Sequence, residues 1–320
     1  MGSEYVILVM RLKWLHIKSS FFRLLPVKSA WRRNFESTYR LLALKLKSRI
    51  QERIVRSVFG QYAYGVVFKS YNGLLMSNFS DIEISSQLGF AGAYDRHKID
   101  FLKSIAADCR SVYIVGAHIG TLLVPMSLAG KEIVAFEANP ITFQYLRNNV
   151  ALNHLTHVRM YNYALYDRDA RLPFYQSKAN TGGSKIKPVH DHFIYNYDEP
   201  ELIEVVGRPL DDVVTSEGID LPDLIIMDIE GAEFHALGGA YKCLSTARYL
   251  YIEFVPHHLK NVAHVSIDAF IAIIMKHFTA MCIVDEAVRH HKKTYRGDEI
   301  VQRLTQLYQV EVAVDLLFNK

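Results

Sequence analysis

The sequence predicts an α/β fold whose central sheet is mostly parallel and carries helices on both faces. From about residue 111 onward, short apolar runs rich in β-branched residues alternate with longer helical segments. Such alternation is typical of parallel strands joined by helices. A glycine-rich turn also joins the first of these runs to the segment that follows it. Strands are expected near 112–116, 132–137, 158–164, 223–228 and 248–254, and helices near 121–129, 140–153, 232–244 and 266–277.

The segments before and after this core are expected to be simpler. Residues 62–78 have the pattern of a hairpin around a Tyr-Asn-Gly turn. A helix is expected over 96–107, with Asp95 as its N-cap. The chain closes on two apolar runs near 280–285 and 308–318, which we expect to be strands with no helix between them. The polar stretch Arg289–Asp298 is expected to be a surface loop between those strands.

The first core strand ends in a turn that suits a nucleotide-like ligand. In Val112–Gly120 an apolar run stops at Gly116, and a second glycine follows at Gly120. A strand that enters a helix through such a turn presents free backbone N–H groups to an anionic or polar ligand. An ordinary tight turn between core elements explains the same pattern. The spacing is G-x-x-x-G and not the dinucleotide fingerprint G-x-G-x-x-G, which disfavours a nicotinamide oxidoreductase.

An acidic residue ends the second core strand. Glu137 lies about 20 residues after the glycine turn, the separation at which a carboxylate can accept the hydroxyls of a ribose. Asn139 and Pro140 follow it and are typical of a helix N-cap and first helical position. Glu137 is therefore also explained as an acid at a helix N-terminus, and the two roles are compatible.

The other core strands also end in polar groups. Asn162–Asp167 follows the third strand, Asp228 and Glu230 follow the fourth, and Glu253 ends the fifth. His257 and His258 come directly after it. Ligands of open α/β sheets bind beyond the carboxyl ends of the strands, so these groups predict a site at that edge.

Five motifs in order carry a family resemblance: Val115–Gly120, Ala135–Pro140, Asn148–Asn153, Ala164–Asp167 and Asp228–Glu233. Over roughly residues 71–254 the chain resembles the FkbM family of S-adenosylmethionine-dependent methyltransferases. The resemblance implies a class I methyltransferase (Rossmann-like) fold with a seven-stranded, mostly parallel sheet, and S-adenosyl-L-methionine as cofactor. The residues that it places around the cofactor are Gly116, Ala117, His118, Gly120, Glu137, Ala138, Asn139, Asn162 and Ala164.

The resemblance implies methyl transfer to a hydroxyl of a sugar, glycolipid or secondary metabolite. Asp228 is the best-placed general base, and Glu230 can share that work or orient a partner. A strand-end turn with Glu230 capping the next helix explains both acids equally simply. His257 or its neighbour His258 is the alternative base. No metal is required for this chemistry. A metal held by Asp228, Glu230 and these histidines is conceivable, but their spacing is not diagnostic of one.

Three positions depart from the family pattern. Ile114 stands where the family usually has an acid, His118 where it usually has Asn, and Ile226 where it often has Lys. These departures leave a second hypothesis open: a catalytically decayed methyltransferase fold that serves as a binding module, tethered to a membrane or partner. The loop Asn180–Ser184, in a linker expected to run to about residue 204, can be a lid over the acceptor or only a flexible connection.

The positive charge of the chain is concentrated at its N-terminus. Residues 1–60 hold 13 Lys and Arg against 3 Asp and Glu, and the remaining residues hold 24 against 30. We expect a basic amphipathic helical arm over 1–60, a hairpin and helix over 61–110, and the methyltransferase domain over 111–320. Residues 1–57 are expected to dock on the domain or to contact an anionic membrane or a partner. We expect a small-molecule or glycan acceptor and no nucleic acid.

Cysteine usage and hydropathy set the expected compartment. Cys109, Cys243 and Cys282 lie far apart and show no metal-like spacing. No run of about 18 apolar residues predicts a membrane-spanning helix. We therefore expect a cytoplasmic protein, with peripheral membrane contact through its basic arm as the alternative.

Overall fold

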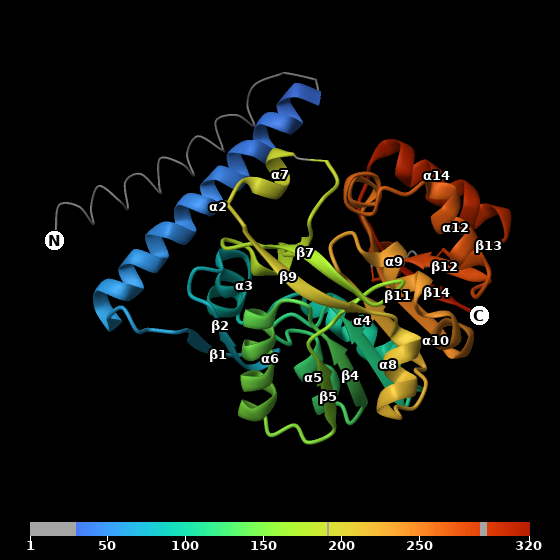
Figure 1. Ribbon diagram of the computed structural model, residues 1–320, viewed down its shortest axis with the longest axis horizontal. Helices are drawn as coiled ribbons and strands as arrows, with labels where there is room; N and C mark the ends of the chain where they lie inside the picture. Colours follow the sequence, from blue (N-terminus) through green and yellow to red (C-terminus); the bar gives the residue numbers. More distant parts are fainter. Residues whose placement is uncertain (1–29, 191, 289–292) are drawn as a thin grey trace.

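The computed structural model describes residues 30–190, 192–288 and 293–320. Its centre is an eight-stranded sheet in the order β13-β12-β14-β11-β10-β3-β4-β5 (Figure 1). The five strands from β11 to β5 are parallel, and β14 pairs antiparallel with both β11 and β12. The strands of this sheet are β3 (Ser111–Val115), β4 (Glu132–Phe136), β5 (Val158–Tyr161), β10 (Leu224–Met227), β11 (Tyr249–Phe254), β12 (Ala280–Ile283), β13 (Tyr295–Arg296) and β14 (Val314–Asn319).

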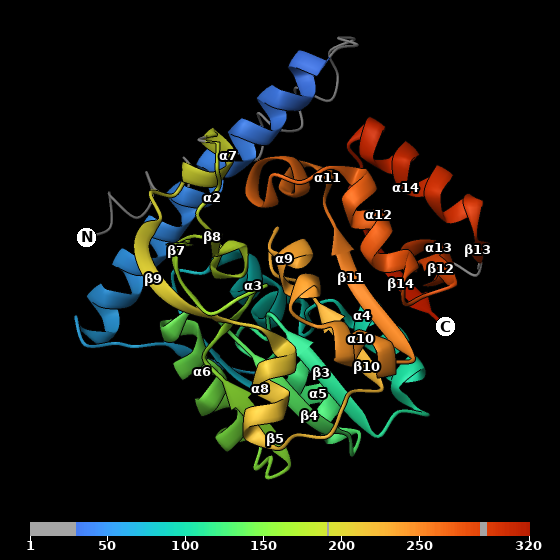
Figure 2. The ribbon, with the colours of Figure 1, turned by 45° about the vertical axis from the view of Figure 1, so that its right-hand side comes forward.

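Helices cover both faces of this sheet, as the predicted fold class requires (Figure 2). The helices are α2 (Ala30–Phe59), α3 (Ile82–Ser86), α4 (Arg96–Ala106), α5 (Leu123–Leu128), α6 (Pro140–Leu152), α7 (Phe193–Asn196), α8 (Leu210–Glu217), α9 (Glu233–Gly238), α10 (Tyr241–Thr246), α11 (Pro256–His258), α12 (Ile267–Met275), α13 (Val284–Val288) and α14 (Asp298–Val310). Short irregular helical turns add η1 (Gln87–Ala91), η2 (Thr181–Gly183) and η3 (Leu259–Ala263).

Alternate residues of the central strands face two separate cores. Tyr113 and Val115 of β3 point into one core, and Val112 and Ile114 point into the other. Every residue of β3 is buried, which is the continuous apolar pattern of a strand covered on both faces. The chain order runs outward from β3 to β5 on one side and from β10 to β11 on the other. The reversal point therefore lies between β3 and β10, where such sheets bind ligands.

The end of the chain differs from its prediction. The strand expected over 308–318 begins only at Val314, because residues to Val310 belong to helix α14. Ile300, Leu304 and Leu307 recur at helical spacing and are buried in the core. Helices α13 and α14 thus lie between β12 and β14, and the expectation of two strands with no helix between them is wrong. The seven expected strands are present, and a two-residue eighth strand, β13, lies within the predicted surface loop.

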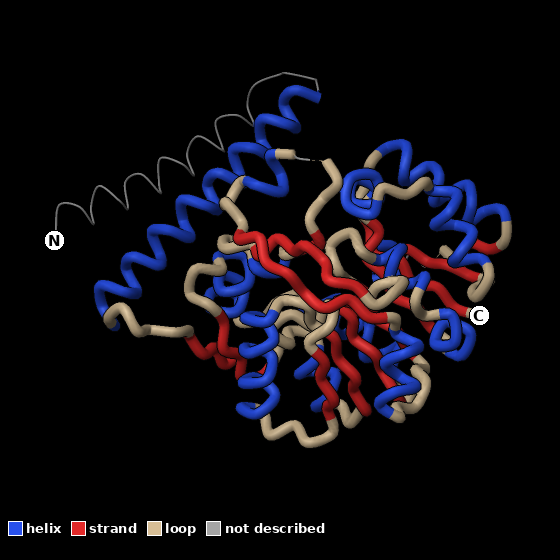
Figure 3. Tube along the Cα trace, in the orientation of Figure 1, coloured by secondary structure: helices blue, strands red, loops and turns tan. Residues whose placement is uncertain are grey.

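A second, four-stranded sheet occupies the segment that was expected to be mostly linker. Its order is β6-β9-β7-β8, with β7 and β9 antiparallel (Figure 3). Leu172, Phe174 and Val205 form its small apolar core. Charged residues and a proline alternate with these apolar positions, so the strands resemble a polar connection in the sequence. The strands of this sheet are β6 (Ala164–Leu165), β7 (Ala170–Gln176), β8 (Lys185–Ile186) and β9 (Glu201–Arg208).

Close backbone contact divides the helix predicted over 232–244 into α9 and α10. At Gly239, between them, an added Cβ would lie 2.2 Å from the carbonyl oxygen of Tyr166. Only glycine allows the backbone from the second sheet to approach so closely. The contact fixes the chain at the end of β6 against the helices that follow β10.

The predicted hairpin is present as β1 (Val66–Ser70) and β2 (Gly73–Ser77). Asn149 of α6 joins it to the core, since its amide accepts from the N–H of Met76 at 2.6 Å and donates to the carbonyl of Ile119 at 2.8 Å. Part of the predicted basic arm, residues 1–29, lies outside the described residues. Within the described residues, no single helix has the length and hydrophobicity to span a bilayer; one bent pair, Pro256–Ala263 with Ile267–Met275, meets that test by length and composition.

Candidate active site

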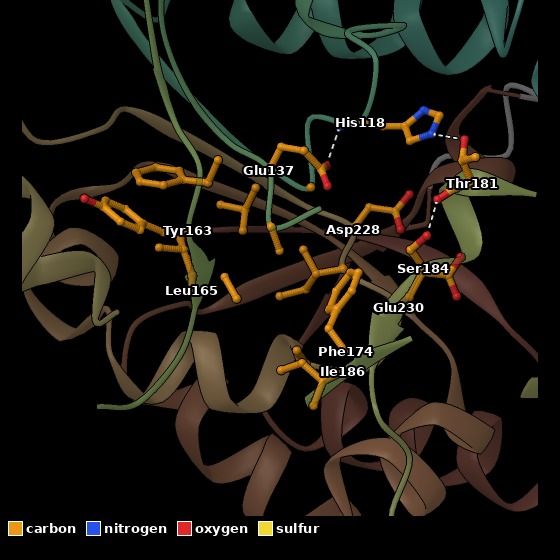
Figure 4. A pocket seen from close by; sticks show the side chains of 18 residues that line it. His118, Glu137, Tyr163, Leu165, Phe174, Thr181, Ser184, Ile186, Asp228 and Glu230 are labelled. Atoms are coloured by element: carbon orange, nitrogen blue, oxygen red, sulfur yellow. Dashed lines mark hydrogen bonds between the residues drawn. The ribbon is translucent and has the colours of Figure 1, made fainter. Parts of the chain in front are cut away.

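Two adjoining cavities open at the carboxyl ends of β3, β4 and β10. The cavity lined by Glu137 is the smaller of the two, and the cavity lined by Glu253 is the larger. In the smaller cavity apolar side chains gather on one side and polar side chains on the other (Figure 4). The residues that line both cavities are Val115, Gly116, His118, Gly182, Asp228 and Glu230.

Gly116 brings three strand ends together. Its φ is +83°, and an added Cβ would lie 1.9 Å from the carbonyl oxygen of Asp228. The N–H groups of Gly116 and Ala117 both donate to the carbonyl of Phe136 at 2.9 Å. The turn is therefore hydrogen-bonded to the end of β4 and in close contact with Asp228, which follows β10. At this point the cavity wall consists of backbone atoms alone.

Glu137 presents a buried carboxylate to the smaller cavity. Its two oxygens accept the backbone N–H groups of His118 and Asn139, each at 2.8 Å. Burial raises the pKa of Glu137 to about 7, although these two hydrogen bonds oppose the shift. Asn139 performs the N-cap role, since its side chain accepts from the N–H groups of Ile141 and Thr142. Asn139 thus caps the helix N-terminus, and the carboxylate of Glu137 faces the cavity, where a ribose is expected.

Some of the residues predicted to contact the cofactor line a cavity, and the others lie behind its wall. Gly116, His118, Glu137, Ala138 and Ala164 line the smaller cavity, and Ala117 lines the larger. Gly120, Asn139 and Asn162 line neither.

Asn162 supports the wall from behind. Its amide donates to the carbonyls of Glu137 and Ala138 at 2.7 and 3.0 Å. Gly120 turns the chain at φ +93° beside Leu146. These positions therefore hold the loop in place, whereas direct contact with a ligand was expected of them.

Two acids expected to act in catalysis follow β10. Glu230 has a left-handed backbone, with φ +55°, and its carboxylate accepts from the ammonium of Lys185 at 2.9 Å. Burial alone would raise the pKa of Glu230, but the charges of Lys185 and its neighbours outweigh burial and lower it. Burial and the charge of Glu230 raise the pKa of Asp228. One acid is therefore held ionised while its neighbour is moved toward neutrality, the separation that acid–base catalysis requires.

Glu253 lies beside Asp228 because β10 and β11 pair in parallel. Met227 is opposite Ile252 in the register, so the next residue of each strand is an acid. Burial, followed by the charge of Asp228, raises the pKa of Glu253. The larger cavity therefore contains an acidic pair that sequence reasoning placed at the same edge but did not bring into contact.

The two histidines after β11 face different ways. His257, the predicted alternative base, lines neither cavity, and its Nδ1 lies 2.9 Å from the hydroxyl of Tyr195. His258 Nε2 lies 3.5 Å from a carboxylate oxygen of Glu230. Burial lowers the pKa of His258 to about 3, so this ring is neutral at ordinary pH. His258 is the histidine that the geometry connects to the site, and a catalytic role for His257 stays a prediction.

The Asn180–Ser184 segment forms a wall of both cavities. Thr181 Oγ1 lies 2.7 Å from His118 Nε2 (Figure 4). Its hydroxyl also donates to Asp81. The N–H of Thr181 donates to the same carboxylate at 3.0 Å. Asp81 is fully buried at the N-cap of α3. These contacts tie the turn to the glycine loop, so it is anchored and is not a free flexible connection.

Sequence reasoning missed two lysines of the site. Lys185 comes from β8 of the second sheet, and Lys98 from α4 lines the larger cavity and lies 3.0 Å from Asp315. Neither lysine has a motif around it. The position of Lys185 directly after the Asn180–Ser184 loop was the available signal, but that segment was expected to be linker.

The model of the FkbM methyltransferase domain matches residues 115–279. That match covers more than half of the chain. The chain belongs to the FkbM methyltransferase family. The class I fold predicted from the motifs is confirmed by the strand order of its central sheet.

Individual relatives share limited sequence identity with this chain. 2-O-methyltransferase NoeI of Sinorhizobium fredii (strain NBRC 101917 / NGR234) is 29% identical over 138 residues, which are 40% of this chain and 55% of that protein. The chain thus spans about half the length of this curated relative.

Solved structures show low identity. Trm5b from Pyrococcus abyssi has a TM-score of 0.40 and 11% identity, covering 81% of this chain and 56% of its own. TYW2 of M. jannaschii in complex with AdoMet has a TM-score of 0.36 and 14% identity, covering 80% and 84%.

The family resemblance implies S-adenosylmethionine as the cofactor, and the described site fits it. Because Gly116 has no side chain, the cofactor can approach the backbone of the cavity wall closely at this point. Glu137 offers carboxylate oxygens to the ribose hydroxyls of the cofactor. Ala164, Leu165 and Phe174 give the smaller cavity an apolar side suited to the adenine ring.

Proposed function

We propose that this FkbM-family methyltransferase methylates a hydroxyl oxygen on a sugar, glycolipid or secondary metabolite. The observation that carries the proposal is the position of Asp228, which lines both cavities where they meet. A carboxylate there stands between a cofactor in the smaller cavity and an acceptor in the larger one. The name of the relative, a 2-O-methyltransferase, favours oxygen as the methylated atom.

Methyl transfer to an alcohol requires alignment, exclusion of water and removal of one proton. The bound cofactor supplies an electrophilic methyl group. Asp228 accepts the proton of the acceptor hydroxyl, and its raised pKa suits a base that works near neutral pH. Glu230, paired with Lys185, supplies the fixed negative charge that raises this pKa. Thr181 and His118 close the wall beside the reacting groups.

The first test is cofactor binding by calorimetry. Purified protein is titrated with S-adenosylhomocysteine, and NAD serves as the control ligand. We expect saturable binding of S-adenosylhomocysteine alone. Binding of NAD in its place would contradict the assignment of the smaller cavity.

The second test concerns the methylated atom. The protein is incubated with S-adenosylmethionine labelled in its methyl group and a panel of methyl glycosides, glycolipids and phenolic metabolites. We expect label in ether-linked methyl groups of one class. Label found on nitrogen or carbon would overturn O-methylation.

The decayed-enzyme hypothesis has one structural observation in its favour. Ile114 and Ile226 are opposite one another in the β3–β10 register, and both line the larger cavity. Two apolar side chains therefore stand where the family often has charged ones. Under this hypothesis the chain lacks turnover and serves as a binding module on a membrane or partner. Label transfer to any acceptor would exclude it.

A further inference from the structure

Three carboxylates meet in the larger cavity. Asp228, Glu230 and Glu253 each offer one oxygen, and these three oxygens lie within 4.8 Å of one another. All three come from the ends of the adjacent parallel strands β10 and β11. Oxygens bound to one cation at about 2.0–2.6 Å have such separations. The spacing therefore suits a single ion at the centre of the three groups.

The charges around this cluster are not balanced within the described residues. Three of the five acids that line the larger cavity form ion pairs. The nitrogen–oxygen distances are 3.6 Å for Glu83 with Arg40, 3.7 Å for Asp95 with Lys98 and 2.9 Å for Glu230 with Lys185. The other two, Asp228 and Glu253, have no ion pair within 4 Å in the described part of the chain.

Adjacent carboxylates repel one another, and partial removal from water adds to the cost of keeping them charged without a cation. Lys185 offsets the charge of Glu230, and Lys98 of the same cavity attracts Asp228 without forming an ion pair within 4 Å. A divalent cation between the three carboxylates would supply further positive charge.

A buried hydroxyl gives a second and independent indication of a ligand. Tyr251 lies two residues before Glu253 on β11, so its side chain is on the same face of the sheet. It lines the same cavity and is 1% exposed, and its hydroxyl makes no hydrogen bond of good geometry within the described residues, although Asp315, opposite Glu253 on β14, lies near it. Buried hydroxyls normally have a partner, and a water molecule on a bound ion would provide one here.

We propose that Asp228, Glu230 and Glu253 bind a divalent cation of the oxygen-preferring class, such as Mg²⁺, Mn²⁺ or Ca²⁺. Three carboxylates and no sulfur or imidazole ligand favour these ions over Zn²⁺ or Cu²⁺. Three protein ligands leave other coordination positions for water and for hydroxyl oxygens of an acceptor. A hydroxyl bound to the ion loses its proton to Asp228 or to solvent more readily, and this use of the ion rests on the proposed function.

The test is direct binding of Mn²⁺ to the full chain after removal of divalent ions with a chelator. Free Mn²⁺ is followed by electron paramagnetic resonance, with and without S-adenosylhomocysteine, which lacks the positive sulfonium charge. We expect one saturable site that Mg²⁺ displaces. Glu253→Gln should weaken Mn²⁺ binding by at least about tenfold, since it removes one of three charged ligands.

Glu83→Gln is the matched control, because Glu83 lines the same cavity but lies outside the three-carboxylate cluster. This variant should bind Mn²⁺ as the unmodified chain does. Retained binding of S-adenosylhomocysteine shows that each variant is folded. Unchanged Mn²⁺ affinity in Glu253→Gln, or no saturable Mn²⁺ binding by a chain that binds S-adenosylhomocysteine, would overturn the ion site and leave the proposed methyl transfer standing.

Discussion

The two cavities of this methyltransferase are built in different ways. The smaller one depends on backbone contacts between the ends of neighbouring strands, and one of its acids, Glu137, is bound by two backbone N–H groups. The larger one gathers charged side chains from α4, β10 and β11, with Lys185 of the second sheet beside them. Damage to the first should therefore affect cofactor binding and folding, and damage to the second should affect turnover.

Replacement of Asp228 by Asn gives the largest effect that we expect, and it concerns turnover alone. Loss of a general base slows reactions by roughly 10²–10⁴-fold. Affinity for S-adenosylhomocysteine should stay within about twofold, because the carboxylate acts on the acceptor. Turnover is measured with labelled S-adenosylmethionine and binding by calorimetry. A large loss of cofactor affinity with unchanged turnover would reverse the roles of the two cavities.

Gly116→Ala tests the backbone contact of the smaller cavity. The added Cβ would overlap the Asp228 carbonyl at 1.9 Å, so the turn must shift. We expect a loss of stability well above the roughly 1–3 kcal/mol that a left-handed non-glycine residue costs, together with loss of S-adenosylhomocysteine binding.

Gly130→Ala is the matched control for this change. Its φ is +78°, and an added Cβ would meet nothing within 4 Å. Urea unfolding should show only the backbone cost for this variant. Equal stability losses in both variants would mean that φ, and not the close contact, explains the glycine at position 116.

Glu137 connects cofactor affinity to pH. Because its pKa is raised to about 7, the carboxyl is largely protonated at lower pH and ionised at higher pH. An ionised carboxylate accepts ribose hydroxyls more strongly, so affinity for S-adenosylhomocysteine should rise by several-fold between about pH 6 and pH 8. Calorimetry at three pH values should show this rise in the unmodified chain and a flat profile in Glu137→Gln. Equal affinity in Glu137→Ala and the unmodified chain would exclude ribose recognition by this residue.

Thr181→Val gives the smallest effect, since it loosens the wall common to both cavities. It removes the hydroxyl that contacts His118 and Asp81, but the backbone bond of residue 181 to Asp81 remains. We expect a loss of about 0.5–1.5 kcal/mol in stability, because Asp81 loses one hydrogen bond and keeps its backbone donors. Thr215→Val, at an exposed hydroxyl on α8, should cost less than about 0.5 kcal/mol. The two are compared by urea unfolding.

The parts of the site that could be predicted are local in the sequence. The glycine turn, Glu137 and the Asn139 cap lie within about 25 residues of one another, and each has its own short-range signal. Helix α14 was missed because its last residues, to Val310, were taken as the start of the apolar strand that follows, and its buried positions before residue 308 were assigned to no element. The second sheet was mispredicted because charged residues and a proline alternate with its apolar positions, so each strand resembles a polar connection in the sequence.

By itself, the sequence determined the fold class, the family motifs and the strand ends at which polar groups collect. Periodicity of apolar residues specifies which segments become strands, and glycine is required where φ is positive and space is absent. Tertiary structure alone decided that Glu253 lies beside Asp228, that Lys185 pairs with Glu230, and that His258 rather than His257 faces this cluster. These contacts join residues tens of positions apart through strand register and sheet packing, which no short segment of the sequence encodes.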